Sequence, residues 1–148
     1  MVQLSRRGFL IGGVAVASTA SVTYAVMADG GRLTMSPPEV LEATRKGDIL
    51  FVDIRRPDEW KSTGVAEGAV PIDLRRDDFI DAVKAARKGN QPVALICARG
   101  VRSRRMTRRL TEAGLTLIVD VPEGMLGSHT GPGWLKRDLP IWEWTGDT

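Results

Sequence analysis

The spacing of apolar residues restricts the fold of this chain more than any other feature. Apolar runs rich in β-branched residues, each too short for a helix of its own, occupy residues 48–55, 68–74, 92–97 and 116–121. Helical candidates lie before and between them, over residues 37–45, 58–61, 77–88 and 101–113. Such alternation is typical of an α/β fold, with a central, mostly parallel sheet and helices on both faces. We therefore predict one domain of this class.

The first of these helices has the clearest boundaries. Ser36 is a candidate N-cap, Pro37 suits the first helical position, and Glu39 follows the cap by three residues. Gly47 suits the left-handed residue that follows a helix end. The pattern predicts a short helix from Pro37 to about Arg45.

The first 28 residues differ in composition from the rest of the chain. Arg6 and Arg7 are their only charged residues, and an uncharged run extends from there to Ala28. The order Ser-Arg-Arg-Gly-Phe-Leu at residues 5–10 resembles a bacterial twin-arginine export signal, and the small residues near Ala28 are typical of a signal peptidase site. We expect export to the periplasm by the twin-arginine machinery, followed by cleavage after Ala28 or, less favourably, after Ala25 or Ala20.

A retained membrane anchor is the alternative, because about 20 uncharged residues can span a bilayer. Glycine, serine and threonine residues dilute the apolar character of this run, which favours the cleaved signal. An uncleaved segment would leave the protein anchored in the membrane and facing the periplasm. The expected organisation is a signal over 1–28, a linker over 29–35, a folded domain over 36–141 and a C-terminal tail over 142–148.

The charge of the mature chain narrows the choice of partners. The full chain has a formal net charge of +3, and loss of Arg6 and Arg7 lowers it to +1, with 19 basic and 18 acidic residues. This balance does not favour binding to a polyanion. Together with the export signal, it argues against nucleic acid as a partner.

Cys97 is the only cysteine of the chain and ends the apolar run 92–97, so it has no partner for an internal disulfide. A metal site would need several more ligands nearby, whereas the only histidine, His129, lies in a glycine-rich stretch, so we expect no metal. Parallel sheets place their sites beyond the carboxyl ends of the strands. Asp53 and Arg55 end another apolar run, and they reach the same sheet edge as Cys97 if the two strands are parallel neighbours.

The loop after this cysteine reads Cys-Ala-Arg-Gly-Val-Arg from Cys97 to Arg102. Ala98 and Gly100 allow the backbone to curl, so that successive N–H groups form an anion-binding nest at a helix start. The helix dipole, Arg99 and Arg102 favour the thiolate of Cys97, which predicts a reactive nucleophile near neutral pH. The alternative is a structural cysteine that packs as a small apolar residue.

These loop residues resemble those of single-domain rhodaneses, a family of sulfurtransferases whose catalytic cysteine lies in a short loop between a strand and a helix. Cys97, Gly100 and Arg102 match the signature Cys-x-x-Gly-x-Arg. The resemblance implies that the Cys97 thiolate takes a sulfane sulfur from a small anionic donor such as thiosulfate. The resulting persulfide then passes the sulfur to a thiol or a cyanide-like acceptor, without a metal or organic cofactor.

The likeness runs from about Ser36 to Pro140. Upstream of the loop, "VDIRRPDEW" is similar to the family's preceding strand and supplies Asp53, Arg55 and Glu59 as supporting residues, and "EGMLGSHTGPGWLKRDLP" is similar to its closing segment. One turn departs from the family pattern, because Val65 and Glu67 stand where many members have His and Pro.

The resemblance also implies roles within the loop. Backbone N–H groups from Ala98 through Val101 to Arg102 are expected to stabilise the persulfide, and Arg99 is placed to reach an anionic donor. Arg102 precedes the apolar face of the next helix, so it is expected either to orient the loop against Asp53 or Glu59, or to contact the substrate.

Arginine continues beyond the loop, and the residues from Cys97 to Arg109 hold six arginines and no acid. Such a run is usually a solvated helix face, and the functional alternative is attraction of an anionic donor or an acidic partner protein.

Two other functions remain open. A cysteine-dependent phosphatase or arsenate reductase would need Cys-x5-Arg, which puts arginine at position 103, where this chain has Ser103. A sulfur carrier without turnover, serving a dedicated partner, would share both fold and nucleophile with an enzyme.

Overall fold

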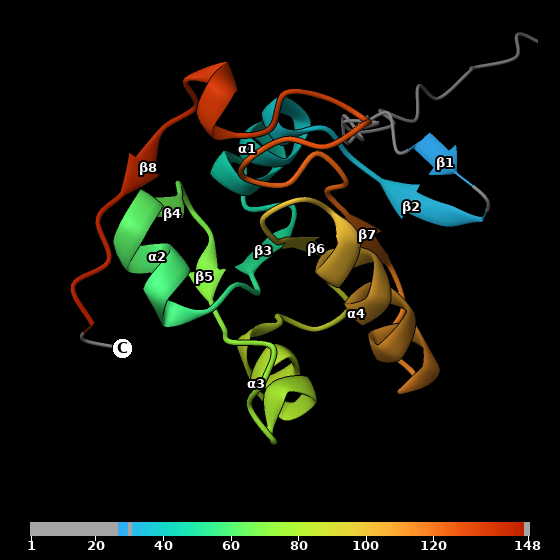
Figure 1. Ribbon diagram of the computed structural model, residues 1–148. Coiled ribbons are helices and arrows are strands. Elements are labelled where there is room, and N and C mark those ends of the chain that lie inside the picture. The colour runs from blue at the N-terminus through green and yellow to red at the C-terminus, as the bar shows by residue number, and fades with distance from the viewer. Residues whose placement is uncertain (1–26, 30, 147–148) are drawn as a thin grey trace, which may run out of the picture.

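The computed structural model describes residues 27–29 and 31–146 (Figure 1). Its helices are α1 (Pro37–Arg45), α2 (Pro57–Thr63), α3 (Phe79–Ala86), α4 (Val101–Glu112) and the 3-10 turn η1 (Leu135–Arg137). Its strands are β1 (Met27–Asp29), β2 (Arg32–Thr34), β3 (Leu50–Asp53), β4 (Val65–Ala66), β5 (Val70–Pro71), β6 (Val93–Ile96), β7 (Ile118–Asp120) and β8 (Ile141–Trp142). The paired arginines of the expected export signal lie outside the described residues.

The predicted mostly parallel sheet is confirmed. Its strands follow the order β1-β2-β7-β6-β3-β5, and every pair is parallel except the edge pair β1–β2. All residues of β3 and β6 are buried, because these central strands are covered on both faces. A separate antiparallel pair joins β4 to β8.

Helices cover both faces of the sheet, and two apolar clusters result. Alternate residues of a strand point to opposite faces. Phe51 therefore packs in the cluster that holds residues of α1 and α2, whereas its neighbour Val52 packs with residues of α3 and α4. Trp134 closes the first cluster, with its ring 5.5 Å from that of Phe51.

The predicted helix starts and ends are largely as expected. In α1 the Glu39 carboxylate accepts hydrogen bonds from the Ser36 N–H at 2.7 Å and from its hydroxyl at 2.6 Å. Gly47 has a φ of +76°, in the left-handed region. The single turn expected over 58–61 is a longer helix, α2, because Pro57 begins it and Gly64 ends it.

Described residues of the two segments expected as linker and tail form strands and pack on the domain. Residues 29–35 contain β2, in which Leu33 pairs with Val119 of β7. The tail begins inside β8, and Trp144 packs edge-on against Trp60 of α2 with ring centroids 5.4 Å apart. The expected cleavage after Ala28 falls within β1.

The turn with Val65 and Glu67 is held by contacts of its own. Val65 pairs with Trp142 of β8, the Glu67 N–H donates to the Pro140 carbonyl at 3.0 Å, and the Glu67 carboxylate pairs with Arg45 at 2.7 Å. Among the described residues, no helix has the length and apolar character needed to cross a membrane.

Candidate active site at the Cys97 loop

The candidate nucleophile lies where β6 meets α4. Strand β6 ends at Ile96, Cys97 follows at 1% exposure, and α4 begins at Val101. Asp53 of β3 lies opposite Ile96 in parallel register, and the Ile54 N–H donates to the Ile96 carbonyl at 3.0 Å. The two strands are therefore the parallel neighbours that would bring both sets of candidate residues to one sheet edge.

Two backbone amides point at the sulfur. The Gly100 N–H donates to Cys97 Sγ at 3.2 Å and the Ser103 N–H at 3.4 Å, and the Ser103 hydroxyl oxygen lies 3.6 Å from Sγ. These amides belong to the N-terminal end of α4, where the first N–H groups have no partner within the helix. They place positive dipoles where a thiolate or persulfide carries its negative charge.

Ser103 was not among the residues predicted from the sequence. The sequence did contain a signal for Ser103, because this residue lies in the first turn of the predicted helix. Backbone N–H groups there have no partner within the helix. Its side chain is fully buried, and the hydroxyl donates to the Gly100 carbonyl at 3.2 Å.

The curl of the loop depends on two glycines. Gly100 has a φ of +81°, and a Cβ there would lie 2.2 Å from the Pro122 carbonyl oxygen. Gly124 has a φ of +68°, and its Cβ would lie 2.4 Å from the Ala98 carbonyl oxygen. Both positions require glycine in conformation and in space, so the loop packs directly on the backbone of residues 122–124.

The segment after β7 also binds the loop carbonyls. The Met125 N–H donates to the Cys97 carbonyl and the Leu126 N–H to the Ala98 carbonyl, each at 2.8 Å. These two hydrogen bonds hold the first half of the loop against residues 125–126.

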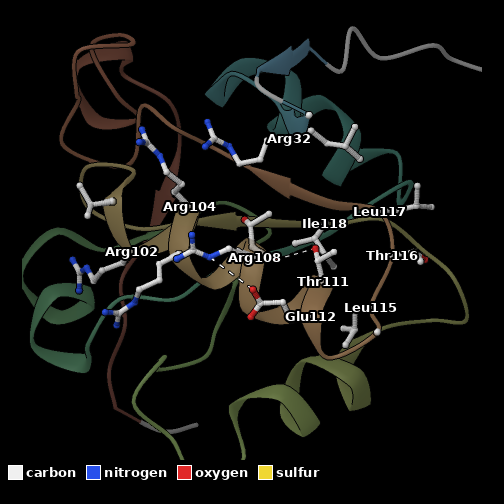
Figure 2. Close-up of a pocket in the computed structure, with 16 residues that line it drawn as sticks. Arg32, Arg102, Arg104, Arg108, Thr111, Glu112, Leu115, Thr116, Leu117 and Ile118 are labelled. Atoms are coloured by element: carbon white, nitrogen blue, oxygen red, sulfur yellow. Dashed lines mark hydrogen bonds and ion pairs between the residues drawn. The ribbon is translucent and has the colours of Figure 1, made fainter.

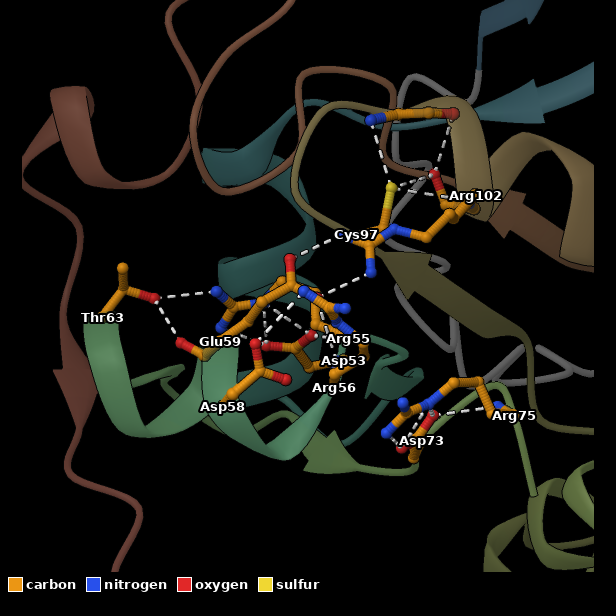
Figure 3. Close-up of polar contacts among 12 residues, drawn as sticks. Asp53, Arg55, Arg56, Asp58, Glu59, Thr63, Asp73, Arg75, Cys97 and Arg102 are labelled. Carbon is orange, nitrogen blue, oxygen red and sulfur yellow. Dashed lines mark hydrogen bonds and ion pairs between the residues drawn. The ribbon is translucent and has the colours of Figure 1, made fainter.

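Arg102 pairs with Glu59. The sequence had left open whether its partner is Asp53 or Glu59. Two parallel hydrogen bonds of 2.7 and 2.6 Å join the guanidinium to the carboxylate and tie α4 to α2 (Figure 3). The hydrogen bonds from Arg102, together with the Arg56 N–H, lower the pKa of Glu59 from 4.5 to about 2 against the opposing effect of burial. Arg102 is thus a positioning residue in this state of the site.

Asp53 and Arg55 form a buried pair on the α2 side (Figure 3). The Arg55 guanidinium donates to both Asp53 carboxylate oxygens, at 3.0 and 2.7 Å, and also to Thr63 Oγ1 at 2.8 Å and the Gly64 carbonyl at 2.7 Å. These bonds fix the end of α2, and through α2 the position of Glu59. Asp53 and Arg55 therefore contact the site indirectly, because they hold α2 and α2 carries Glu59.

The tip of the loop faces solvent. Arg99 is exposed, with Nη1 3.5 Å from the Gly127 carbonyl, and Val101 is 74% exposed. Ala98 is half-buried between them and the cysteine. The exposed Arg99 guanidinium therefore lies at the tip of the loop that begins with Cys97.

One buried acid near the loop was also missed. Asp120 ends β7 at 0% exposure, and neither carboxylate oxygen has a hydrogen bond of good geometry from the described part of the chain. Burial raises the pKa of Asp120, and the nearby Ser103, Arg32 and Arg104 oppose this rise. Its run, 116–121, has the apolar pattern of a buried strand, which gives no hint of a buried charge.

The fold and the site define an α/β domain whose single cysteine lies in an amide-lined loop between a strand and a helix. The family model of the rhodanese-like domain matches residues 36–128, more than half of the chain. The chain therefore belongs to the rhodanese-like family.

Solved structures agree with this assignment. The Rv0390 protein of M. tuberculosis is 25% identical, with a TM-score of 0.60 over 75% of this chain and 97% of that one. The polysulfide-sulfur transferase homodimer of Wolinella succinogenes is 22% identical, with a TM-score of 0.60 over 81% and 85% of the two chains. A Rhodopseudomonas palustris protein of unknown function, described as a possible tyrosine phosphatase, is 21% identical, with a TM-score of 0.58 over 78% and 88%. No curated protein matches the chain.

Proposed function

We propose that this protein is a sulfurtransferase that carries a sulfane sulfur on Cys97. The observation that supports this most is the position of Sγ, which receives the N–H groups of Gly100 and Ser103 at 3.2 and 3.4 Å at the start of α4. Membership of the rhodanese-like family and the likeness to a polysulfide-sulfur transferase support sulfur transfer as the general class of chemistry.

The first step loads the cysteine. The Cys97 thiolate attacks the outer sulfur of thiosulfate, the S–S bond of thiosulfate breaks, and sulfite leaves with the bonding electron pair. The product is a Cys97 persulfide, whose terminal sulfur carries the negative charge. The N–H groups of Gly100 and Ser103, which donate to Sγ, and the other N–H groups from Ala98 to Arg102 would stabilise that charge.

The second step transfers the sulfur from Cys97 to an acceptor. A thiol or cyanide attacks the terminal sulfur, the persulfide S–S bond breaks, and the Cys97 thiolate is restored as the leaving group. With cyanide the product is thiocyanate. Arg99 attracts the anionic donor from the loop tip, and the Arg102–Glu59 pair holds the loop in shape. The chain's own residues supply every role in this scheme, with no metal or organic cofactor.

A continuous assay separates an enzyme from a carrier. With thiosulfate and cyanide, an enzyme releases thiocyanate over many turnovers, whereas a carrier stops after one equivalent. Cys97→Ser should release none while remaining folded, because a hydroxyl does not hold a sulfane sulfur.

A phosphatase is the second function to test, because one structural neighbour is described as a possible tyrosine phosphatase. In this chain the position of the phosphatase arginine holds Ser103, whose N–H and hydroxyl already face Sγ. Ser103 thus contacts the sulfur at the position where a phosphatase would have its arginine. Hydrolysis of an aryl phosphate faster than sulfur transfer would overturn the proposed chemistry.

We also propose that residues 1–28 direct export to the periplasm. The support is the sequence pattern alone, in which Arg6 and Arg7 precede a long uncharged run.

A further inference from the structure

A groove lies beside the catalytic loop. It has a volume of about 800 Å³ and runs along α4, with residues 31–33 and 114–118 as its other walls (Figure 2). This volume is within the range of specific ligand sites. Val101 and Arg102 belong both to the catalytic loop and to this groove, so the two sites adjoin.

Apolar side chains form part of the groove lining. Leu33, Leu115 and Ile118 line it together with two exposed residues, Val101 at 74% and Leu117 at 43% exposure. Leu117 has a φ of +58°, a left-handed conformation that leucine rarely adopts. Exposed apolar side chains gathered in a concave surface indicate a binding site more than they indicate a solvated face.

Arginines line the half of the groove that is nearer to the Cys97 loop, and Glu112 with residues 114–118 lines the other half (Figure 2). Arg102, Arg105 and Arg108 recur along α4, over a rise of about 9 Å, while Arg32 and Arg104 extend side by side at its upper edge (Figure 2). Arg102 is paired with Glu59, and Arg108 lies 4.0 Å from Glu112, the one carboxylate among the lining residues. Arg105 is exposed and has no ion-pair partner in the part of the chain that the structure describes.

Charge and apolar character together restrict the occupant of the groove. A basic half beside an apolar half fits a polypeptide segment that carries both acidic and apolar side chains, and an anionic lipid surface is the alternative that the test includes. Single-stranded nucleic acid needs aromatic platforms for its bases, and none of the described lining residues is aromatic. A second copy that presented the same α4 would repel this one. The chain's own first 28 residues carry only positive charge.

We propose that the α4 groove docks a polypeptide segment with acidic and apolar side chains, carried by the protein that exchanges sulfur with Cys97. This inference rests on the proposed sulfur transfer. Apolar side chains of the partner would fill the space over Leu33 and Leu117, and its carboxylates would pair with Arg104, Arg105 and Arg108. Because the groove ends at Val101, a docked segment would bring the partner's sulfur to the catalytic loop.

The test uses a synthetic peptide of defined chemistry. A helical peptide of about 14 residues, long enough for roughly 20 Å, carries leucine on one face and glutamate on both flanks. Versions with a cysteine at either end cover both directions of binding. A peptide with lysine in place of every glutamate is the matched control for charge.

Binding is measured by fluorescence anisotropy on the full chain. Arg105→Glu/Arg108→Glu should weaken binding of the glutamate peptide by about tenfold, since each reversed exposed charge changes the binding free energy modestly. Arg109→Glu makes the same kind of change on the same helix but outside the groove, and it should change affinity by less than about twofold. Binding should also fall as salt rises.

Sulfur transfer gives a second readout. The double variant should transfer sulfur to cyanide at the native rate but deliver less to the peptide cysteine, by about the factor lost in binding. If native protein transfers sulfur to neither acceptor yet binds the peptide in the groove, the sulfur chemistry is wrong while the docking site stands.

Three outcomes overturn the docking proposal. They are equal affinity for the glutamate and lysine peptides, equal affinity of the native and double-variant proteins, and absence of peptide binding when vesicles rich in phosphatidylglycerol do bind. The last result would assign the arginines to a membrane surface.

Discussion

Gly100 determines the shape of the Cys97 loop, because it combines a φ of +81° with a Cβ position 2.2 Å from the Pro122 oxygen. We predict that Gly100→Ala abolishes sulfur transfer and destabilises the fold by at least about 2 kcal/mol, since strain and clash add. Gly47→Ala is the control, because Gly47 has a similar φ of +76° with nothing within 4 Å. Urea unfolding of both variants measures the difference. Equal losses in the two would show that Pro122 does not restrict the loop.

The ionised form of Asp120 lowers the stability of the fold, because burial raises the pKa of Asp120 above its value in the unfolded chain. The folded state is therefore favoured at low pH, and this contribution is lost as the pH rises through the folded pKa. We predict that Asp120→Asn raises the melting temperature by about 3 °C at neutral pH and that the gain shrinks in acid.

The matched control is Asp81→Asn, since the Asp81 side chain is 82% exposed. It should leave the melting temperature nearly unchanged. A melting temperature of Asp120→Asn below that of the native protein at neutral pH would mean that the Asp120 charge is stabilising, through Arg32 or Arg104.

Among secondary-structure elements, α2 and α4 are joined by the Arg102–Glu59 pair. The pKa of Glu59 is lowered from 4.5 to about 2, chiefly because Arg102 donates to the ionised carboxylate. A depressed carboxyl pKa stabilises the fold above the unfolded value, and the contribution is lost as pH falls from about 4.5 toward 2.

Glu59→Gln should therefore lower the free energy of unfolding at neutral pH. It should also remove the part of the acid-induced loss of stability that falls between about pH 4.5 and 2. Denaturant unfolding across the window, with Glu143→Gln as an exposed control, measures the effect. If native and Glu59→Gln proteins lose stability in parallel between about pH 4.5 and 2, the pair does not hold the two helices together.

Sequence patterns predicted the elements that depend on local signals. The β-branched runs predicted β3 and β6, and Ser36 with Pro37 predicted the start of α1. Glu59 was named as one of two partners of Arg102, because Arg102 precedes the apolar face of the next helix and the family resemblance implies Glu59 as a supporting residue. The sheet edge shared by Asp53, Arg55 and Cys97 was predicted on the condition that their strands are parallel neighbours, as β3 and β6 are.

The elements that were missed depend on contacts distant in sequence. Strands β2 and β8 are too short for an alternating pattern, and each exists through a partner far along the chain, β7 and β4 respectively. Ser103 and Asp120 acquire their surroundings only when α4 packs on β7. Burial of a polar residue in a run that otherwise reads as strand cannot be inferred from the run itself.

At the scale of the whole molecule, the export proposal assigns residues 1–28 to a signal, whose last two residues belong to β1 of the sheet. We predict that Arg6→Lys/Arg7→Lys keeps the protein in the cytoplasm of a bacterial host, because the paired arginines are the feature that the export machinery reads. Cell fractionation and blotting measure the distribution, with the native chain in a host that lacks the twin-arginine translocase as the control. Export of the double-lysine protein by that same route would contradict the assignment.

The central claim is that Cys97 carries sulfur, and intact-mass measurement tests it most directly. Purified, reduced protein is mixed with thiosulfate, separated from it, weighed, and weighed again after cyanide is added. We predict a mass increase of one sulfur atom that is absent in Cys97→Ser, and its loss on cyanide with one equivalent of thiocyanate released. An unchanged mass after thiosulfate and after a polysulfide, or an added sulfur that persists in Cys97→Ser, would contradict the account.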